Sequence, residues 1–158
     1  MFRKMRRTKN EIPLEAAKEL LRKNKRGALA VLGDERYPFA VPINFFYDEE
    51  ENRLYFHSAK TGHKMDAMKA NDKVCFTTWD DGYLVEGDWA YHVSSCVVFG
   101  RARLVEDQQL AKEKIRRLGL KYYPGSEEVE QEIEKAFRAV QVVAIDIEHI
   151  SGKKIHER

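Results

Sequence analysis

The 158-residue sequence is short of the features that mark secreted, membrane and disulfide-bonded proteins. Only two cysteines are present, Cys75 and Cys96, and they lie in separate strand-like runs without C-x-x-C spacing. We expect them to be small buried thiols in a reducing compartment. No apolar run approaches the ~20 residues that a membrane-spanning helix needs, and the N-terminus lacks the apolar segment of a signal peptide. These absences predict a cytoplasmic protein with no membrane contact.

Positive and negative charges are also nearly balanced in the sequence. Lys and Arg total 28 and Asp and Glu total 26, which leaves a formal net charge of +2 and predicts no nucleic-acid partner. The local exception is the basic arm of residues 1–10, with the sequence MFRKMRRTKN. It is expected either to be a solvated tail or to contact the cofactor or a partner. Residues 11–158 are expected to form a single domain.

Hydrophobic periodicity predicts six strands and four helices. The expected strands are 28–32, 37–48, 53–58, 73–79, 90–106 and 141–150, and the expected helices are 13–26, 62–71, 107–123 and 126–140. Most turns between strands are too short for parallel crossovers, so an antiparallel sheet curled into a small barrel with flanking helices is predicted, an α+β fold. Pro42 cannot donate to a ladder and is expected at an edge, a bulge or a ligand-facing stretch. Gly100 is a candidate bulge or corner.

The segment HSAKTGHK (57–64) places several cations at the predicted start of a helix, with Thr61 as the expected N-cap. A helix N-terminus favours acidic side chains, so Lys60, His63 and Lys64 are unfavourable there unless an anion binds. A phosphate, held by backbone N–H groups, a hydroxyl and an ammonium, would remove this conflict. The alternative is a solvated, lysine-flanked helix end.

The histidines and cysteines show no metal signature in their spacing. His57 and His63 lack the i, i+4 separation of a helical zinc pair, and the two cysteines are badly spaced to join them. The sequence therefore predicts no metal site.

Four segments, taken in chain order, carry a resemblance to a known family. They are GALAVLGDERYPFAVPINFFYD, LYFHSAKTGHKMDAMKANDKVCFT, SSCVVFGRARLVED and VVAIDIEHISGKK. From about Arg6 to Lys154 the chain resembles the pyridoxamine 5'-phosphate oxidase-related flavoproteins, and most of all their nitroimidazole-reductase-like branch. The resemblance implies an FMN-binding split β-barrel, usually a homodimer with two flavin sites at the subunit interface.

The resemblance also implies a set of flavin-contacting residues. They are Pro42, Ile43, Asn44, His57, Ser58, Ala59, Gly62, His63, Lys64 and Ser95. The segment matching HSAKTGHK would wrap the FMN phosphate, and the segment matching VPIN would run along the isoalloxazine ring. Gly62 would let the backbone approach the phosphate closely.

For three of these residues a purely structural role is the alternative. Ser95, implied to complete the ring contacts, can instead bond to the neighbouring backbone of its strand. Asn44 can cap a turn. His57, the one candidate for a catalytic side chain because it would lie near the flavin, can be a satisfied core histidine.

The implied activity is reduction of small organic acceptors, such as nitroaromatics, with electrons from NADH or NADPH. A non-catalytic flavin carrier or sensor is the alternative, and a haem-handling split-barrel protein is a further one. Pyridoxamine 5'-phosphate oxidation is disfavoured, because true oxidases typically end in an arginine-bearing R-L-x-P segment and this chain ends in IEHISGKKIHER.

Overall fold

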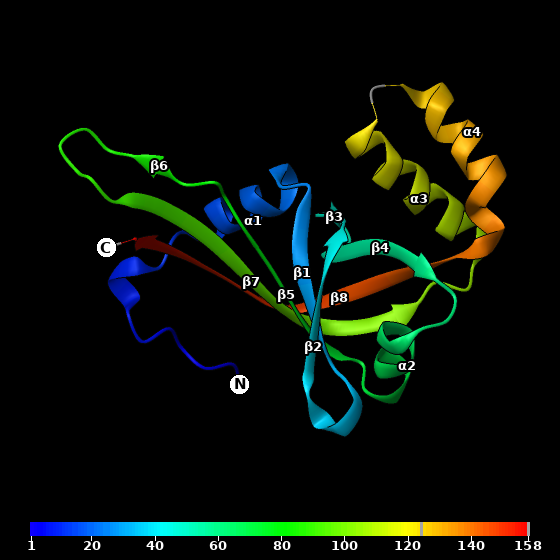
Figure 1. Cartoon of the computed structure of the whole chain (residues 1–158), viewed down its shortest axis with the longest axis horizontal. Coiled ribbons are helices and arrows are strands. Elements are labelled where there is room, and N and C mark those ends of the chain that lie inside the picture. The colour runs from blue at the N-terminus through cyan, green and yellow to red at the C-terminus, as the bar shows by residue number, and fades with distance from the viewer. Residues whose placement is uncertain (124, 158) are drawn as a thin grey trace.

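One antiparallel sheet of eight strands forms the centre of the fold (Figure 1), and the computed structural model describes residues 1–123 and 125–157. Its strands follow the order β2-β1-β5-β7-β8-β4-β3, and β6 pairs with β7 outside this path. The strands are β1 (Arg26–Leu32), β2 (Pro38–Asn44), β3 (Phe46–Asp48), β4 (Arg53–Ala59), β5 (Lys73–Trp79), β6 (Tyr83–Leu84), β7 (Tyr91–Leu104) and β8 (Val140–His156).

The sheet curls into a barrel that stays open on one side. β2 and β3 are the two ends of the strand order, yet only Phe45 separates them along the chain. Phe45 is fully buried, so the two ends of the sheet are held near each other while β2 pairs with β1 alone among the described strands. The predicted antiparallel split barrel is confirmed, and Pro42 lies in the edge strand β2.

Apolar clusters cover both faces of β4, since successive side chains of a strand point to opposite sides. Leu54 and Phe56 belong to the larger cluster, which fills the barrel interior together with Phe76 of β5. Tyr55 belongs to a smaller cluster outside the barrel, where it packs with Ala144 of β8. The outer cluster gives helices a surface on which to pack.

Four α-helices and three short 3₁₀ helices surround the sheet in the described part of the chain. They are α1 (Leu14–Lys23), α2 (His63–Ala70), α3 (Gln108–Tyr122), α4 (Ser126–Ala136), η1 (Thr8–Asn10), η2 (Asp34–Arg36) and η3 (Phe137–Ala139). α3 packs on the outer cluster, and α4 lies beside α3 (Figure 1). The Asp107 side chain caps α3 by accepting hydrogen bonds from two backbone N–H groups. Pro124, in the predicted connection between these helices, lies outside the described residues. Across residues 1–123 and 125–157, no helix is both long and apolar enough to span a bilayer.

The strand predictions hold for most of the chain but differ in three places. The single strand predicted at 37–48 is two strands, β2 and β3, which lie at opposite ends of the strand order because the chain leaves the ladder at the buried Phe45. β8 continues to His156 instead of ending at residue 150, because its last residues pair with β7 although they are largely polar. The predicted loop 80–89 contains the two-residue strand β6. The bulge predicted at Gly100 is confirmed by a register shift between Phe99 and Gly100, where an added Cβ would lie 2.5 Å from the Asp146 carbonyl oxygen.

The basic arm lies along the outer surface of β7 and β8. The Phe2 ring stacks on Phe99 at a centroid distance of 5.6 Å and on His149 at 4.8 Å. The arm is therefore anchored by an aromatic contact instead of by its cations. Whether it also contacts a cofactor or a partner stays a prediction.

Both cysteines are free thiols inside the sheet. Cys96 is fully buried, and burial raises the pKa of its thiol to about 12. Cys75 is half-buried, and burial raises the pKa of its thiol as well. Both groups are therefore protonated and unreactive at neutral pH.

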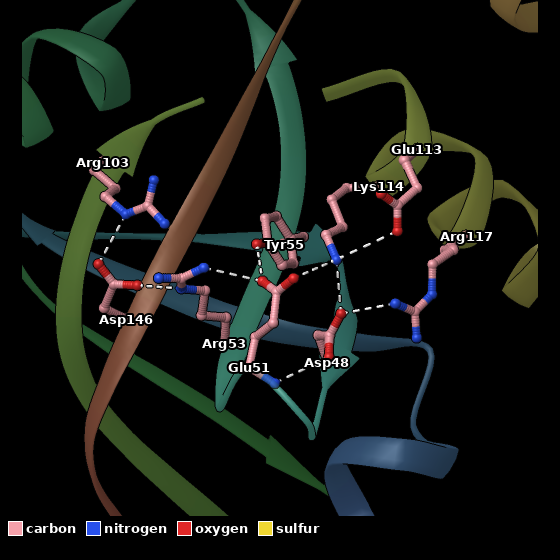
Figure 2. A network of polar contacts seen from close by, with 9 residues as sticks. All are labelled: Asp48, Glu51, Arg53, Tyr55, Arg103, Glu113, Lys114, Arg117 and Asp146. Atoms are coloured by element: carbon pink, nitrogen blue, oxygen red, sulfur yellow. Dashed lines mark hydrogen bonds and ion pairs between the residues drawn. The ribbon is translucent and has the colours of Figure 1, made fainter. Parts of the chain in front are cut away.

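A buried ion network fastens α3 to the turn between β3 and β4 (Figure 2). The Lys114 ammonium lies 2.8 Å from Asp48 Oδ2 and 2.7 Å from Glu51 Oε1. Lys114 is only 2% exposed and Asp48 1%. Arg117, one turn further along α3, donates to the same oxygen of Asp48 at 2.7 Å. Two carboxylates from the sheet thus hold two cations of one helix face.

The network shifts the ionisation of its members in the direction that keeps them charged. Burial alone would lower the pKa of Lys114, but hydrogen bonds to Asp48 and Glu51 outweigh burial and raise it. The hydrogen bond from Lys114, helped by one from Tyr55, lowers the pKa of Glu51 from 4.5 to about 2. α3 is therefore held over the sheet by groups that stay ionised at neutral pH.

Candidate functional site

The open side of the barrel contains a pocket between the edge strand β2 and the start of α2. We call it the edge pocket. It has a volume of about 260 Å³. The residues that line it are Phe39, Val41, Pro42, Ser58, Thr61, Gly62, His63, Lys64 and Met65. Five of the ten predicted flavin-contacting residues thus meet in one place, from two segments that are distant in the sequence.

Lys64 is the most unusual group in the edge pocket. It is half-buried, and burial lowers the pKa of its ammonium. Its Nζ lies 5.6 Å from the centre of the Phe56 ring. Within residues 1–123 and 125–157, no carboxylate forms an ion pair with it. A partly desolvated cation without a carboxylate partner is a good binding group for an anion.

The backbone at the start of α2 supports the same interpretation. Gly62, and not the predicted Thr61, is the N-cap residue, and no side chain caps the helix. Gly62 adopts φ 129° and ψ 168°, a conformation that only glycine reaches without strain, while a Cβ placed there would have open space around it. Thr61 fails as a cap because the chain turns into the helix one residue later. The uncapped N–H groups and the helix dipole favour an anion at this end.

His63 lines the edge pocket, but its ring is engaged elsewhere. Its Nε2 accepts a hydrogen bond from the backbone N–H of Asp34 at 3.1 Å. The ring packs on Phe39 at a centroid distance of 4.3 Å. This ring therefore connects α2 to the turn between β1 and β2, and the predicted contact of His63 with the phosphate stays a prediction.

A second cavity, of about 190 Å³, lies between the sheet and the α3–α4 pair, and we call it the helix cavity. Asn44 and His57 form its wall on the sheet side. Its other lining residues are mostly apolar or aromatic and come from the helices and their flanks: Ile115, Leu118, Gly119, Tyr122, Tyr123, Val129, Glu132, Ile133, Ala136, Phe137 and Val140. This wall was not predicted from the sequence, because the apolar periodicity of the two helices does not show which face of the sheet they cover.

His57, which lines the helix cavity, is affected by the charge of Lys64, which lines the edge pocket. Burial, and next the positive charge of Lys64, lower the pKa of the His57 imidazole. His57 and Ser58 are neighbours in β4, so their side chains point to opposite faces of the strand. The helix cavity and the edge pocket therefore lie on the two sides of the end of β4. Although part of the His57 side chain is exposed, both effects favour its neutral form.

Three predicted residues line neither cavity. Ile43 is 7% exposed and its side chain belongs to the barrel core, so only its backbone is available to a ligand. Ala59 is exposed at the end of β4, paired with Val140. The Ser95 hydroxyl donates to the Lys153 carbonyl oxygen at 3.5 Å within the sheet. Their flavin contacts stay predictions.

The sequence pattern of the pyridoxamine 5'-phosphate oxidase family matches residues 13–154. The chain belongs to this family. The family resemblance predicted from the sequence, from about Arg6 to Lys154, is thereby confirmed over residues 13–154. No curated protein matches the chain.

Solved structures similar to this family member share its fold. A candidate 5-nitroimidazole antibiotic resistance protein from Bacteroides thetaiotaomicron superposes with a TM-score of 0.77 at 21% identity, over 92% of this chain and 87% of that chain. A FAD-binding protein from Mesorhizobium loti has a TM-score of 0.67 at 22% identity, over 92% of this chain and 96% of that chain. The flavocytochrome Anf3 from Azotobacter vinelandii has a TM-score of 0.76 at 22% identity, over 95% of this chain and 71% of that chain.

Proposed function

We propose that the protein binds FMN and uses it to reduce small organic acceptors, including nitroaromatics, with electrons from NADH or NADPH. The observation that carries this proposal is Lys64, a half-buried cation without a carboxylate partner at the uncapped start of α2. It lies in the open side of a barrel whose family and structural neighbours include flavin proteins. We also infer that the protein works in the cytoplasm, where its two free thiols would stay reduced.

The edge pocket fits the phosphate end of FMN. Lys64 would supply the charge, Ser58 a hydroxyl, and the first N–H groups of α2 further donors. Gly62 has no side chain to block the approach, and the space where its Cβ would be is open. The donors come from one short segment, so they can close around one phosphate.

The remaining contacts would be made by the strands next to the pocket. Pro42 has no backbone N–H group, so at this position the edge strand β2 cannot donate a hydrogen bond to a further strand. Asn44 offers an amide that can donate and accept hydrogen bonds, and His57 offers a neutral imidazole. We propose that these two side chains meet the ring system at the mouth of the helix cavity.

Bound flavin would supply the redox chemistry, and the protein supplies position, electrostatics and access. The apolar wall of the helix cavity would exclude water and accept a small planar molecule. Partial burial and the charge of Lys64 lower the pKa of His57, which favours the neutral imidazole. It can therefore orient an acceptor by a hydrogen bond without placing a second positive charge beside the ring.

Anaerobic reduction of the FMN-loaded protein by NADH or NADPH tests the activity. We expect the flavin absorption to bleach and to recover when a nitroimidazole is added, over several turnovers. Free FMN at the same concentration is the control. Tight FMN binding without reduction would favour the carrier or sensor, and a haem spectrum in the purified protein would contradict the flavin assignment.

We further propose that the protein is a homodimer. The β6–β7 hairpin projects from the body of the molecule (Figure 1) and exposes a group of apolar side chains. They are Tyr83, Leu84, Val85, Trp89 and Tyr91 of the hairpin, together with Trp79 at the end of β5. Such a group, next to the short strand β6, is a surface that a second copy can cover.

Trp89→Glu is expected to convert the dimer into a monomer. Trp89 is 77% exposed, so the substitution places a charge on the proposed interface without disturbing the core. Leu14→Glu, at a residue that is 55% exposed on α1, is the matched control and should leave the dimer intact. Light scattering of both variants and of the wild type measures the mass. A monomeric wild type with full FMN occupancy would contradict the proposal.

A further inference from the structure

A cluster of metal-ligating side chains lies at the far end of the β7–β8 ladder. One ligand atom each from Asp88, His92 and His156 can be chosen so that all three lie within 4.8 Å of one another. The three residues come from the segment before β7, from β7 itself and from the end of β8. Neither the edge pocket nor the helix cavity includes any of them.

The sheet register brings the two histidines together. His92 and His156 are direct partners in the antiparallel ladder, so their side chains lie on the same face of the sheet. Their ring centroids are 4.0 Å apart and the ring planes are inclined by 61°. The end of β8 is held in place by a 2.8 Å hydrogen bond from the backbone N–H of Glu157 to the carbonyl oxygen of Tyr91. His156 is therefore part of the sheet and not of a loose tail.

Asp88 completes the cluster and is itself oriented. Its Oδ2 lies 3.1 Å from His92 Nε2, and its Oδ1 accepts a hydrogen bond from the backbone N–H of Ala90 at 3.1 Å. The Asp88 side chain is 18% exposed and His92 is 8% exposed. A carboxylate and an imidazole are thus already in contact and largely shielded from water, while His156 faces the solvent.

We propose that Asp88, His92 and His156 form a binding site for a divalent transition-metal ion of the Zn²⁺ class. Two imidazoles and one carboxylate suit zinc, nickel, cobalt or copper better than calcium or magnesium, which prefer oxygen ligands. A proton held between His92 and Asp88 would leave to the solvent when the ion binds. Solvent reaches the remaining coordination position on the His156 side. Sequence spacing predicted no metal site because His92 and His156 become neighbours only through the β7–β8 pairing.

A bound ion would tie the β6–β7 hairpin to the end of β8. Within the hairpin, β6 pairs with β7 through two residues, Tyr83 and Leu84, and Asp88 lies in the segment between the two strands. The metal would therefore cross-link this segment to the paired ends of β7 and β8. Its effect on thermal stability should be larger than the effect of an ion bound at a random surface histidine.

Calorimetric titration of the tag-free, chelator-treated full chain with Zn²⁺ tests the site. We expect one ion per chain, and a melting midpoint that rises with added Zn²⁺. His156→Ala and Asp88→Asn should each weaken Zn²⁺ binding at least about tenfold, since even the loss of a group that only orients a ligand costs 10–100-fold. Both substitutions are conservative for the fold, because His156 is exposed and the Asn oxygen can still accept from Ala90.

His149→Ala is the matched control, because His149 lies on the same strand and is absent from the cluster. It should bind Zn²⁺ like the wild type and keep the shift in melting midpoint. Failure of the wild type to bind Zn²⁺ at millimolar concentration would overturn the proposal. So would His156→Ala with unchanged affinity, and an unaffected Asp88→Asn would exclude the three-ligand site.

Discussion

Lys114→Met is expected to lower the free energy of unfolding by about 3–5 kcal/mol, because it leaves the buried Asp48 carboxylate and its neighbour Glu51 without their shared cation. Lys114 is 2% exposed and contacts both Asp48 and Glu51. Methionine keeps the length of the aliphatic chain, so the loss is mainly electrostatic. Arg117 still reaches Asp48, which is why we expect destabilisation instead of complete unfolding. Urea denaturation at neutral pH measures the change.

Lys112→Met is the matched control, since Lys112 is an exposed lysine of the same helix. Its substitution should change the free energy of unfolding by less than about 0.5 kcal/mol. Adding Asp48→Asn to Lys114→Met should recover part of the loss, because it removes one of the unpaired charges. A loss below about 1 kcal/mol for Lys114→Met would show that the ion network does not hold α3 in place.

The acid dependence of the same variant provides a second measurement. The folded-state pKa of Glu51 is about 2 against an ordinary value of 4.5, so between these values the unfolded chain binds more protons than the folded chain. The stabilisation from Glu51 is therefore complete above about pH 4.5 and is lost as the pH falls toward 2. Since Lys114 is the largest cause of this shift, the stability difference between wild type and variant should shrink across that range.

Lys64→Ala is expected to weaken FMN binding about ten- to a hundredfold. The substitution removes one charge-assisted contact with the phosphate, worth about 1.5–3 kcal/mol. Riboflavin lacks the phosphate and should bind weakly to both proteins, with little change between them. Fluorescence titration of the flavin-free wild type and variant with each ligand measures the four affinities.

Two further measurements separate a direct role of Lys64 from an indirect one. Without a flavin, Lys64 opposes the dipole of α2, so its removal should be neutral or slightly stabilising. The positive charge of Lys64 lowers the pKa of His57, so that pKa should rise in the variant when it is followed by NMR. Lys69→Ala, at the other end of the same helix, is the charge-matched control. Equal losses of FMN and riboflavin would mean that Lys64 acts through the fold or the ring contacts.

The parts of the fold that depend on local pattern were visible in the sequence. Alternating apolar residues indicated the strands. Pro42 indicated an edge and Gly100 a bulge, because the conformational limits of proline and glycine depend on the residue itself and not on distant contacts. The cations at the start of α2 predicted a bound anion, because their conflict with the helix dipole is also visible in one short segment. The segment at 151–156 was missed, since its place in β8 depends on pairing with β7 and not on its own composition.

Features that depend on distant residues could not be predicted. Lys114 and Asp48 are 66 positions apart, and both look like ordinary surface charges in the sequence. The helix cavity likewise depends on which face of the sheet α3 and α4 cover. Local secondary-structure propensity carries no information about such contacts, because they form only when folding brings distant parts of the chain together.

The position of β8 in the sheet has a consequence for folding during synthesis. β8 is the last strand along the sequence, yet it lies between β7 and β4 in the middle of the strand order. Until it leaves the ribosome, the sheet consists of two separate pieces, β2-β1-β5-β7 and β4-β3, each with an open edge. Such edges are the sites where nascent chains associate wrongly. The pairing of Arg53 with Asp146 also joins residues far apart in the sequence, which favours slow folding and lengthens the time for which these edges stay open.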